Sequence, residues 1–146
     1  MKALVYHGPG KKTLQDRPMP VISAPGDAIV KMTQTTICGT DLHILKGDVP
    51  TCVPGRILGH EGVGIVHETG TGITAFKKGD HVLISCISAC AICEACRKGM
   101  YSHCQSGGWI LGNSIGGTQA GYVRIPHANT SLYKIPDDAN EDALVM

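Results

Sequence analysis

Features that direct a protein to a membrane or to nucleic acid are scarce in this 146-residue chain. No apolar run reaches the length of about 18 residues that a membrane-spanning helix needs. The N-terminal residues 1–7 turn polar too early for a secretory signal. The net charge is only +1, without the basic block that neutralises phosphates. We therefore predict a cytoplasmic protein that binds neither membrane nor nucleic acid.

Aromatic residues are also few, at 4%, and charged residues make up only 17%, whereas hydrophobic residues reach 42%. This composition excludes a disordered chain and a coiled coil. Glycine, in contrast, occurs 19 times, about twice its usual share, which predicts many tight turns. The length is typical of a single domain, which we assign to residues 1–146.

Short apolar stretches between turn signals predict a mainly β fold. The candidate strands lie at 1–6, 28–35, 62–68, 80–86, 122–126 and 131–135. One short helix is predicted at Thr40–Gly47, ended by its glycine. Because the sequence has no long amphipathic helix, we expect a compact β-barrel or sandwich.

The stretch Gly70–Ala75 formally matches the glycine-rich pattern of a dinucleotide-binding loop. Such a loop needs the N-terminus of a helix behind it to hold a pyrophosphate. Here Phe76–Asp80 is instead typical of a turn into another strand. We therefore predict a connecting turn, and no nucleotide-binding unit in this chain.

The C-terminal residues 137–146 carry the start of a helix. Asp138 is followed by Glu141 three positions later, which is typical of a helix N-cap, and the apolar residues 143–146 come next. A helix that begins and is then cut predicts a truncated chain.

The seven cysteines include one dense group: Cys90, Cys93, Cys96 and Cys104. This group lies in a long irregular segment, residues 85–117, which needs a stabiliser because it has no evident core. Its spacing lets four thiolates close a tetrahedron around a structural zinc. Disulfides are less favoured in a reducing compartment, and a ferredoxin-type iron–sulfur cluster has a shorter last spacer followed by proline.

Two weaker motifs bring further candidate ligands, Cys38 and the pair His60 and Glu61, each with glycine beside it. A thiolate, an imidazole and a carboxylate together suit a catalytic zinc that keeps its fourth position open. A lone cysteine, however, is usually a small buried hydrophobe, and a lone histidine is usually structural. The residues alone leave a second metal open, and they predict buried packing for Cys52 and Cys86.

Taken in order, four motifs resemble the zinc-dependent medium-chain alcohol dehydrogenases of bacterial type: Cys38–His43, Gly59–Gly64, Gly79–Val82 and the four-cysteine group. The resemblance covers essentially the whole chain. It implies a GroES-like catalytic domain, a partly open β-barrel with short helices and a zinc-binding lobe at about 85–117. The parent protein would add an α/β Rossmann domain, which binds NAD or NADP and lies beyond this chain.

The resemblance also implies roles for single residues. Cys38 and His60 match ligands of the catalytic zinc, and Glu61 matches an acidic neighbour that can ligate it directly or lie just behind it. Asp41 matches a carboxylate that orients the histidine. Thr40 matches the hydroxyl beside the substrate alcohol, and His43 matches the outer end of a proton relay. Trp109 matches a wall of the substrate pocket. The residues that match the ligands of the structural zinc are Cys90, Cys93, Cys96 and Cys104.

The implied activity of the parent is reversible oxidation of a primary or secondary alcohol to an aldehyde or ketone by zinc-assisted hydride transfer to NAD(P). The parent is expected to be a homodimer or homotetramer, and this chain alone is expected to be inactive. Two alternatives stay open: a non-catalytic zinc-binding module, in which Cys38 and His60 are structural, and a stand-alone chaperonin-like β domain.

Overall fold

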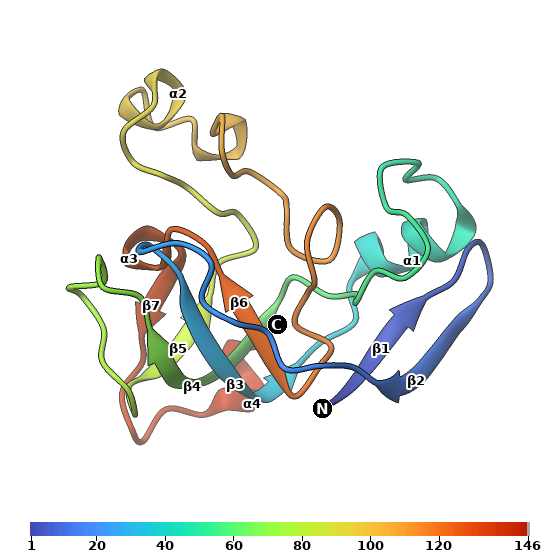
Figure 1. Cartoon of the computed structure of the whole chain (residues 1–146), viewed down its shortest axis with the longest axis horizontal. Coiled ribbons are helices and arrows are strands. Elements are labelled where there is room, and N and C mark those ends of the chain that lie inside the picture. The colour runs from blue at the N-terminus through green and yellow to red at the C-terminus, as the bar shows by residue number, and fades with distance from the viewer. Residues whose placement is uncertain (146) are drawn as a thin grey trace.

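The structure is a computed structural model that describes residues 1–145. Two antiparallel sheets and several short helices make up the chain (Figure 1). The strands are β1 (Lys2–Tyr6), β2 (Lys12–Asp16), β3 (Ala28–Thr35), β4 (Gly62–Thr69), β5 (His81–Ile84), β6 (Tyr122–Ile125) and β7 (Leu132–Lys134). The helices are α1 (Gly39–Lys46), α2 (Glu94–Arg97), α3 (Ala128–Ser131) and α4 (Glu141–Leu144), with a 3-10 turn η1 (Tyr101–His103).

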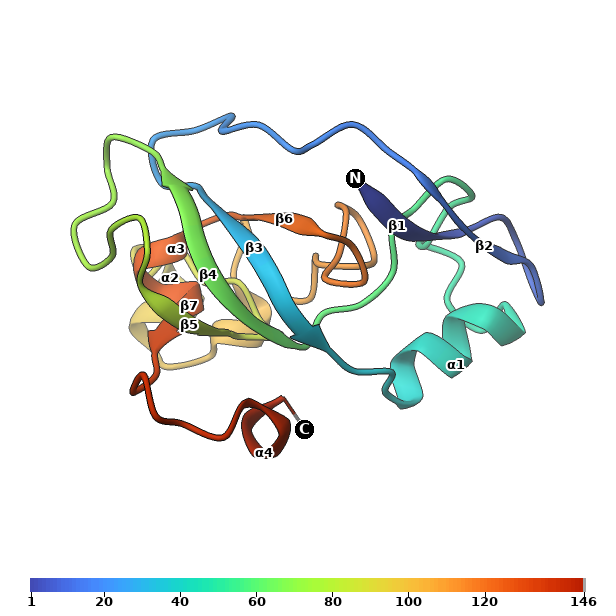
Figure 2. The same ribbon diagram turned by 90° about the horizontal axis from the view of Figure 1, so that it is seen from below.

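The larger sheet has the strand order β6-β3-β4-β5-β7, and every neighbouring pair is antiparallel. Its longest strands, β3 and β4, run side by side through the middle (Figure 2). The two edge strands, β6 and β7, are joined directly by α3, so one short stretch of chain links both edges. The sheet therefore curls into a partly open barrel, and residues 1–145 contain no closed one. The predicted fold class is confirmed.

Aliphatic side chains fill the inside of this barrel, as the alternating apolar residues of the strands predict. The buried core comprises Ala28, Val30, Val66, Val82, Ile84, Leu111, Val123, Ile125, Ala128 and Leu132. Leu111 is the one member from the long irregular segment 85–117. Its burial ties the second half of that segment to the barrel.

Strand β1 pairs with β2 on one side and with two irregular segments on the other. The Leu4 N–H donates to the Gln119 carbonyl at 2.8 Å, and the Leu58 N–H donates to the Leu4 carbonyl at 3.1 Å. The Gln119 N–H in turn donates to the Leu58 carbonyl at 2.9 Å. These bonds hold residues 57–59 beside residues 117–119, and so determine where the following residue, His60, lies.

Two sequence-based expectations about regular structure need correction. Strand β2 has no counterpart among the predicted strands, because four of its five residues are polar, most are exposed, and only its pairing with β1 defines it. Helix α4 is capped by Asn140, whose side chain accepts the Asp142 N–H at 3.0 Å, so the predicted cap at Asp138 is wrong. The predicted C-terminal helix extends to Met146, which lies outside the described residues.

Other expectations can be compared directly. Cys52 is buried, as predicted, but Cys86 is exposed just after β5, so its predicted burial is wrong. Gly70–Ala75 lies in the connection between β4 and β5, and no helix occurs between these strands, which confirms the predicted turn. Over residues 1–145, no helix is long and apolar enough to cross a membrane.

Asp27 anchors the start of β3. Its buried carboxylate oxygen Oδ2 accepts the N–H groups of Ser23 and Ala24, each at 3.0 Å, and the Ser23 hydroxyl at 2.9 Å. Arg124 of β6 adds an ion pair at 3.1 Å. Burial by itself raises the pKa of Asp27, but the Ser23 donors and the Arg124 guanidinium together hold it below the ordinary value.

Replacement Asp27→Asn should therefore destabilise the fold by about 2 kcal/mol at neutral pH, because an amide loses the charge-assisted bonds. A carboxyl whose pKa is lowered by folding stabilises the protein above the unfolded pKa, and this contribution disappears as pH falls through the folded pKa. Urea unfolding at pH 7 and near pH 3 checks both points. The gap between wild type and Asp27→Asn should shrink at the acidic pH, and a gap independent of pH would contradict the assignment.

Candidate metal centres

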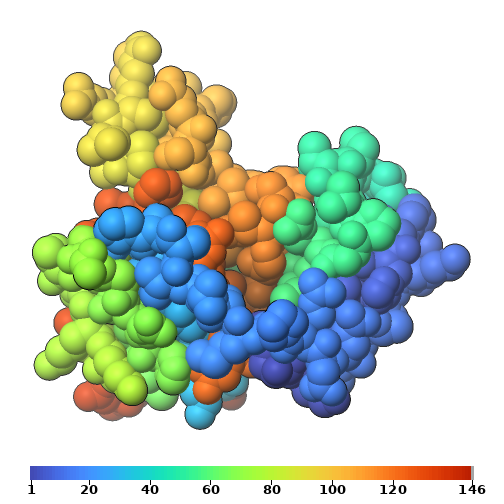
Figure 3. Space-filling model, viewed as in Figure 1, coloured from blue at the N-terminus to red at the C-terminus, as the bar shows by residue number. Residues whose placement is uncertain are grey.

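Within residues 85–117, the part that carries the four cysteines protrudes from the barrel as a lobe (Figure 3). Helix α2 and turn η1 lie within it and are too short to form a core. The sulfur atoms of Cys90, Cys93, Cys96 and Cys104 all lie within 4.8 Å of one another. The Cys90 N–H points at the Cys104 sulfur at 3.3 Å, and the Cys93 N–H points at the Cys90 sulfur at 3.4 Å. The four residues predicted to hold a structural zinc are thus brought together.

Large apolar side chains contribute almost nothing to the inside of the lobe. Its small buried cluster consists of Ala89 and the cysteines themselves. Ile92 is 72% exposed, and Met100 and Tyr101 are also exposed. Four converging thiols, with no further protein donor among residues 1–145, fit the closed shell of a structural zinc, and a metal would replace the missing core.

Zinc binding by the lobe should release protons. The backbone N–H groups of Ile92 and Cys93 lower the pKa of Cys90 to about 6, whereas burial raises that of Cys96 to about 12. Cys96 therefore carries a proton at pH 7, and zinc takes thiolates only. We expect at least about one proton released per zinc at pH 7, the one that Cys96 carries, and more below pH 6, where affinity falls. Calorimetry in buffers of different ionisation enthalpy measures this number; a value of zero would contradict it.

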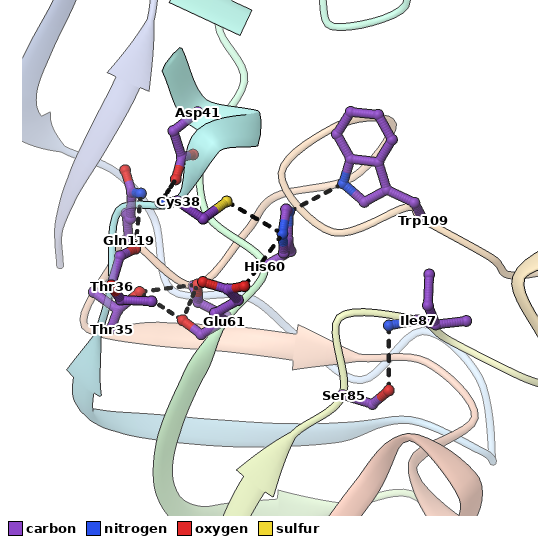
Figure 4. A network of polar contacts seen from close by, with 11 residues as sticks. Thr35, Thr36, Cys38, Asp41, His60, Glu61, Ser85, Ile87, Trp109 and Gln119 are labelled. Atoms are coloured by element: carbon purple, nitrogen blue, oxygen red, sulfur yellow. Dashed lines mark hydrogen bonds and ion pairs between the residues drawn. The ribbon is translucent and has the colours of Figure 1, made fainter. Parts of the chain in front are cut away.

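A second group of candidate ligands converges where β3 leads into α1. Cys38 directly precedes α1, and His60 and Glu61 directly precede β4. The Cys38 sulfur lies 3.4 Å from His60 Nε2, and Glu61 Oε1 lies 3.9 Å from the same nitrogen (Figure 4). Thiol, imidazole and carboxylate donors, all within 4.8 Å of one another, fit a zinc with a fourth position left for another ligand.

The backbone around Glu61 is held by side chains that sequence reasoning missed. The hydroxyls of Thr35 and Thr118 both donate to the Glu61 carbonyl, at 2.9 and 3.0 Å, and lie 3.0 Å from each other. The Gln119 amide donates to the Thr36 carbonyl at 3.3 Å. These contacts join segments far apart in the sequence, so no local signal could have identified them.

Asp41 lies beside this centre but does not reach the imidazole. Its Oδ2 accepts the Cys38 N–H at 3.1 Å, which caps the start of α1. Its Oδ1 is buried and, among the described residues, has no hydrogen-bond partner. Within residues 1–145, no hydrogen bond joins Asp41 to His60. An unpaired buried carboxylate oxygen here favours a positive charge nearby.

The other predicted site residues lie on α1 and in the segment that carries Trp109. Thr40 is half-buried in the first turn of α1. His43 is exposed further along α1, and its Nδ1 lies 3.0 Å from Oδ2 of Asp48, a partner that sequence reasoning missed. The Trp109 indole N–H donates to His60 Nδ1 at 3.1 Å, with the two rings edge to face at 81°. Trp109 therefore contacts a candidate ligand directly.

Residues 24–137 match the family described as the alcohol dehydrogenase GroES-like domain. The chain belongs to this family. Among curated relatives, it is 38% identical to zinc-type alcohol dehydrogenase B of Aspergillus flavus, over 100% of this chain and 34% of that protein. It is 39% identical to an alcohol dehydrogenase of Cupriavidus necator, over 100% of this chain and 44% of that protein.

Solved structures agree with the family assignment. Zinc-dependent alcohol dehydrogenase 2 of Streptococcus pneumonia, in its apo form, superposes with a TM-score of 0.94 at 57% identity, over 99% of this chain and 41% of that one. Alcohol dehydrogenase TADH of Thermus sp. ATN1 gives 0.91 at 34% identity, over 99% and 43%. The chain therefore spans less than half the length of these relatives.

Proposed function

We propose that residues 1–146 form the catalytic domain of a zinc-dependent alcohol dehydrogenase, with Cys38, His60 and Glu61 holding the catalytic zinc. One observation supports this most: ligand atoms of three chemical types converge although Cys38 and His60 are 22 positions apart. The four cysteines of the lobe hold a separate, structural zinc. The names of these relatives, a zinc-type and a zinc-dependent alcohol dehydrogenase, support a zinc enzyme.

The proposed reaction interconverts a primary or secondary alcohol and its aldehyde or ketone. When bound, zinc supplies a Lewis acid for the substrate oxygen, and a nicotinamide supplies the hydride acceptor. Thr40 lies in the first turn of α1, two residues after Cys38. Its hydroxyl oxygen accepts the alcohol proton, and its own hydroxyl proton passes on to His43. His43 exchanges that proton with solvent, because its ring is exposed and Asp48 holds Nδ1 in place. Trp109 forms one wall of the substrate pocket.

Other parts of the functional protein have to supply the nicotinamide site. Residues 1–145 contain no glycine-rich loop followed by a helix, and the relatives are more than twice as long as this chain. We propose that a Rossmann domain binds NAD or NADP, that the whole protein forms a homodimer or homotetramer, and that it works in the cytoplasm, where thiols stay reduced. The chain alone is expected to show no NAD(P)-linked alcohol oxidation above a metal-free control.

Zinc stoichiometry tests the metal assignment. Titrated with zinc, the chain should take up one tight equivalent in the lobe and a second, weaker equivalent at Cys38, His60 and Glu61. The variant Cys38→Ser should lose the weaker equivalent and keep the tight one. Cys86→Ser, the same replacement at a thiol outside both groups, should keep both. Two equivalents in Cys38→Ser would show that Cys38 is not a ligand and would favour a non-catalytic zinc-binding module.

A further inference from the structure

The hydrogen bond between Trp109 and His60 determines which ring nitrogen can carry a proton. An indole N–H only donates, so His60 Nδ1, 3.1 Å away, presents its lone pair to Trp109. A neutral imidazole carries its single proton on the other nitrogen. The proton is therefore on Nε2, where the Cys38 sulfur lies 3.4 Å away as an acceptor.

The same nitrogen, Nε2, is the one that the proposed metal needs. It lies closest to the other candidate ligands, 3.4 Å from the Cys38 sulfur and 3.9 Å from Glu61 Oε1. A metal at Nε2 takes its lone pair, so the ring proton has to move, through water, to Nδ1 without a change in the charge of the ring. Nδ1–H and the indole N–H then face each other as two donors with no acceptor between them.

We propose that Trp109 and the metal compete for His60, so that loading of the second metal centre breaks the Trp109–His60 hydrogen bond and moves the indole. This inference rests on the proposed function, because it takes Cys38, His60 and Glu61 as the ligands. It gives Trp109 a second role besides that of a pocket wall. Each metal loading event is coupled to a displacement of the side chain that borders the substrate.

The surroundings of Trp109 permit that displacement. The indole is only half-buried, so its N–H can bind water once it leaves His60. Its ring packs at the edge of an apolar cluster: Tyr6, Ile44, Cys52 and Leu58. The Trp109 backbone is held separately from the ring, because the Asn113 amide donates to the Trp109 carbonyl at 3.4 Å. The indole can therefore turn away from His60 by rotation of its side chain, with the Asn113 bond keeping the backbone in place.

The single tryptophan makes the inference directly measurable, because the chain gives one indole N–H signal in a proton–nitrogen NMR spectrum. The starting state is the chain with one equivalent of zinc, which fills the lobe. Further zinc should shift the indole signal and speed its exchange with water, in step with binding of the second equivalent measured by dialysis. In Cys38→Ser the indole signal should stay in place.

The variant Trp109→Phe tests the competition itself. It removes the N–H but keeps an aromatic ring, so the second zinc should bind about fivefold more tightly, the factor expected for one released neutral hydrogen bond. Tyr6→Phe, which removes a hydroxyl from the same apolar cluster, should leave zinc affinity unchanged. Weaker binding in Trp109→Phe would overturn the inference, since Trp109 would then support the ligand.

Two further outcomes separate this inference from the proposed function. If the second zinc binds and the indole signal does not move, the competition is overturned, while Cys38, His60 and Glu61 remain the metal centre. If no second equivalent binds at any zinc concentration, both the metal centre and the competition are overturned.

Discussion

Replacing Cys96 by serine should abolish zinc binding by the lobe and unfold the part of residues 85–117 that carries the four cysteines, while the barrel stays folded. Cys96 is buried among the other three sulfurs, so serine removes one of the four ligands of a closed shell. Loss of residues that merely orient a ligand weakens a zinc site about 10- to 100-fold, so loss of a ligand should exceed that range. Structural zinc supplies about 10–16 kcal/mol to the small folds that depend on it.

The lobe has little else to hold it. Its apolar side chains, such as Ile92 and Met100, face solvent, and α2 is a single turn of four residues. Around the four cysteines, the lobe and the barrel share polar contacts: the Ser88 hydroxyl lies 3.2 Å from that of Ser131, and the His127 ring lies 3.1 Å from the Ser106 hydroxyl. Such contacts hold a lobe that is already folded, but they bury too little surface to fold it.

Zinc analysis and limited proteolysis of the Cys96→Ser protein check this expectation. The variant should lose the tight equivalent of zinc and be cleaved within residues 85–117 at protease concentrations that leave the wild type intact. Cys86→Ser provides a matched control, since it removes an exposed thiol at the foot of the same lobe. A Cys96→Ser protein that keeps the tight zinc would show that three thiolates suffice.

The lobe could be predicted from the sequence because all its ligands lie within one short segment. The spacing of Cys90, Cys93, Cys96 and Cys104 alone limits how far apart the sulfurs can be. The strands with apolar alternation, such as 28–35, were equally predictable, since their burial follows the pattern of their own residues. In contrast, β2 exposes a polar stretch, and only its pairing with β1 shows that it is a strand.

The second centre could not be predicted from local patterns. Cys38 and His60 meet only because β3 and β4 pair and place the two residues at one end of the sheet. Their roles came from the resemblance to a family, not from spacing. The helix cap at Asp138 failed for a similar reason. The Glu141 carboxylate, which a capping box would use locally, instead pairs with His81 of β5 at 2.9 Å.

The contact between Trp109 and His60 was even harder to predict from the sequence, because it depends on two backbone segments that lie side by side. The segment that carries Trp109 continues into residues 117–119, which pair with residues 57–59. The Gly117 N–H donates to the Ile57 carbonyl at 3.0 Å, and the Thr118 N–H donates to the Gly59 carbonyl at 3.0 Å. Only glycine fits where these two backbones come closest.

Replacing Gly117 by alanine should destabilise the protein by about 3 kcal/mol or more and remove the weaker zinc equivalent. A Cβ atom at position 117 would overlap the Gly59 carbonyl oxygen and approach the Leu58 carbonyl oxygen to 2.5 Å. Backbone atoms cannot move aside as a side chain does, so the two segments have to separate. Their separation breaks the pairing that places His60, and the second metal centre is lost with it.

Gly116→Ala is the matched control, one residue away in the same segment. There the added Cβ would meet only the Ile57 side chain, at 3.7 Å, which is ordinary van der Waals contact. Alanine at a position that accepts it without strain stabilises a protein by about 0.4–1 kcal/mol, because it restricts the unfolded chain. Urea unfolding of the zinc-loaded proteins should therefore move the midpoint down for Gly117→Ala and slightly up for Gly116→Ala. Equal midpoints would mean that the close approach of residues 117 and 59 does not determine the position of His60.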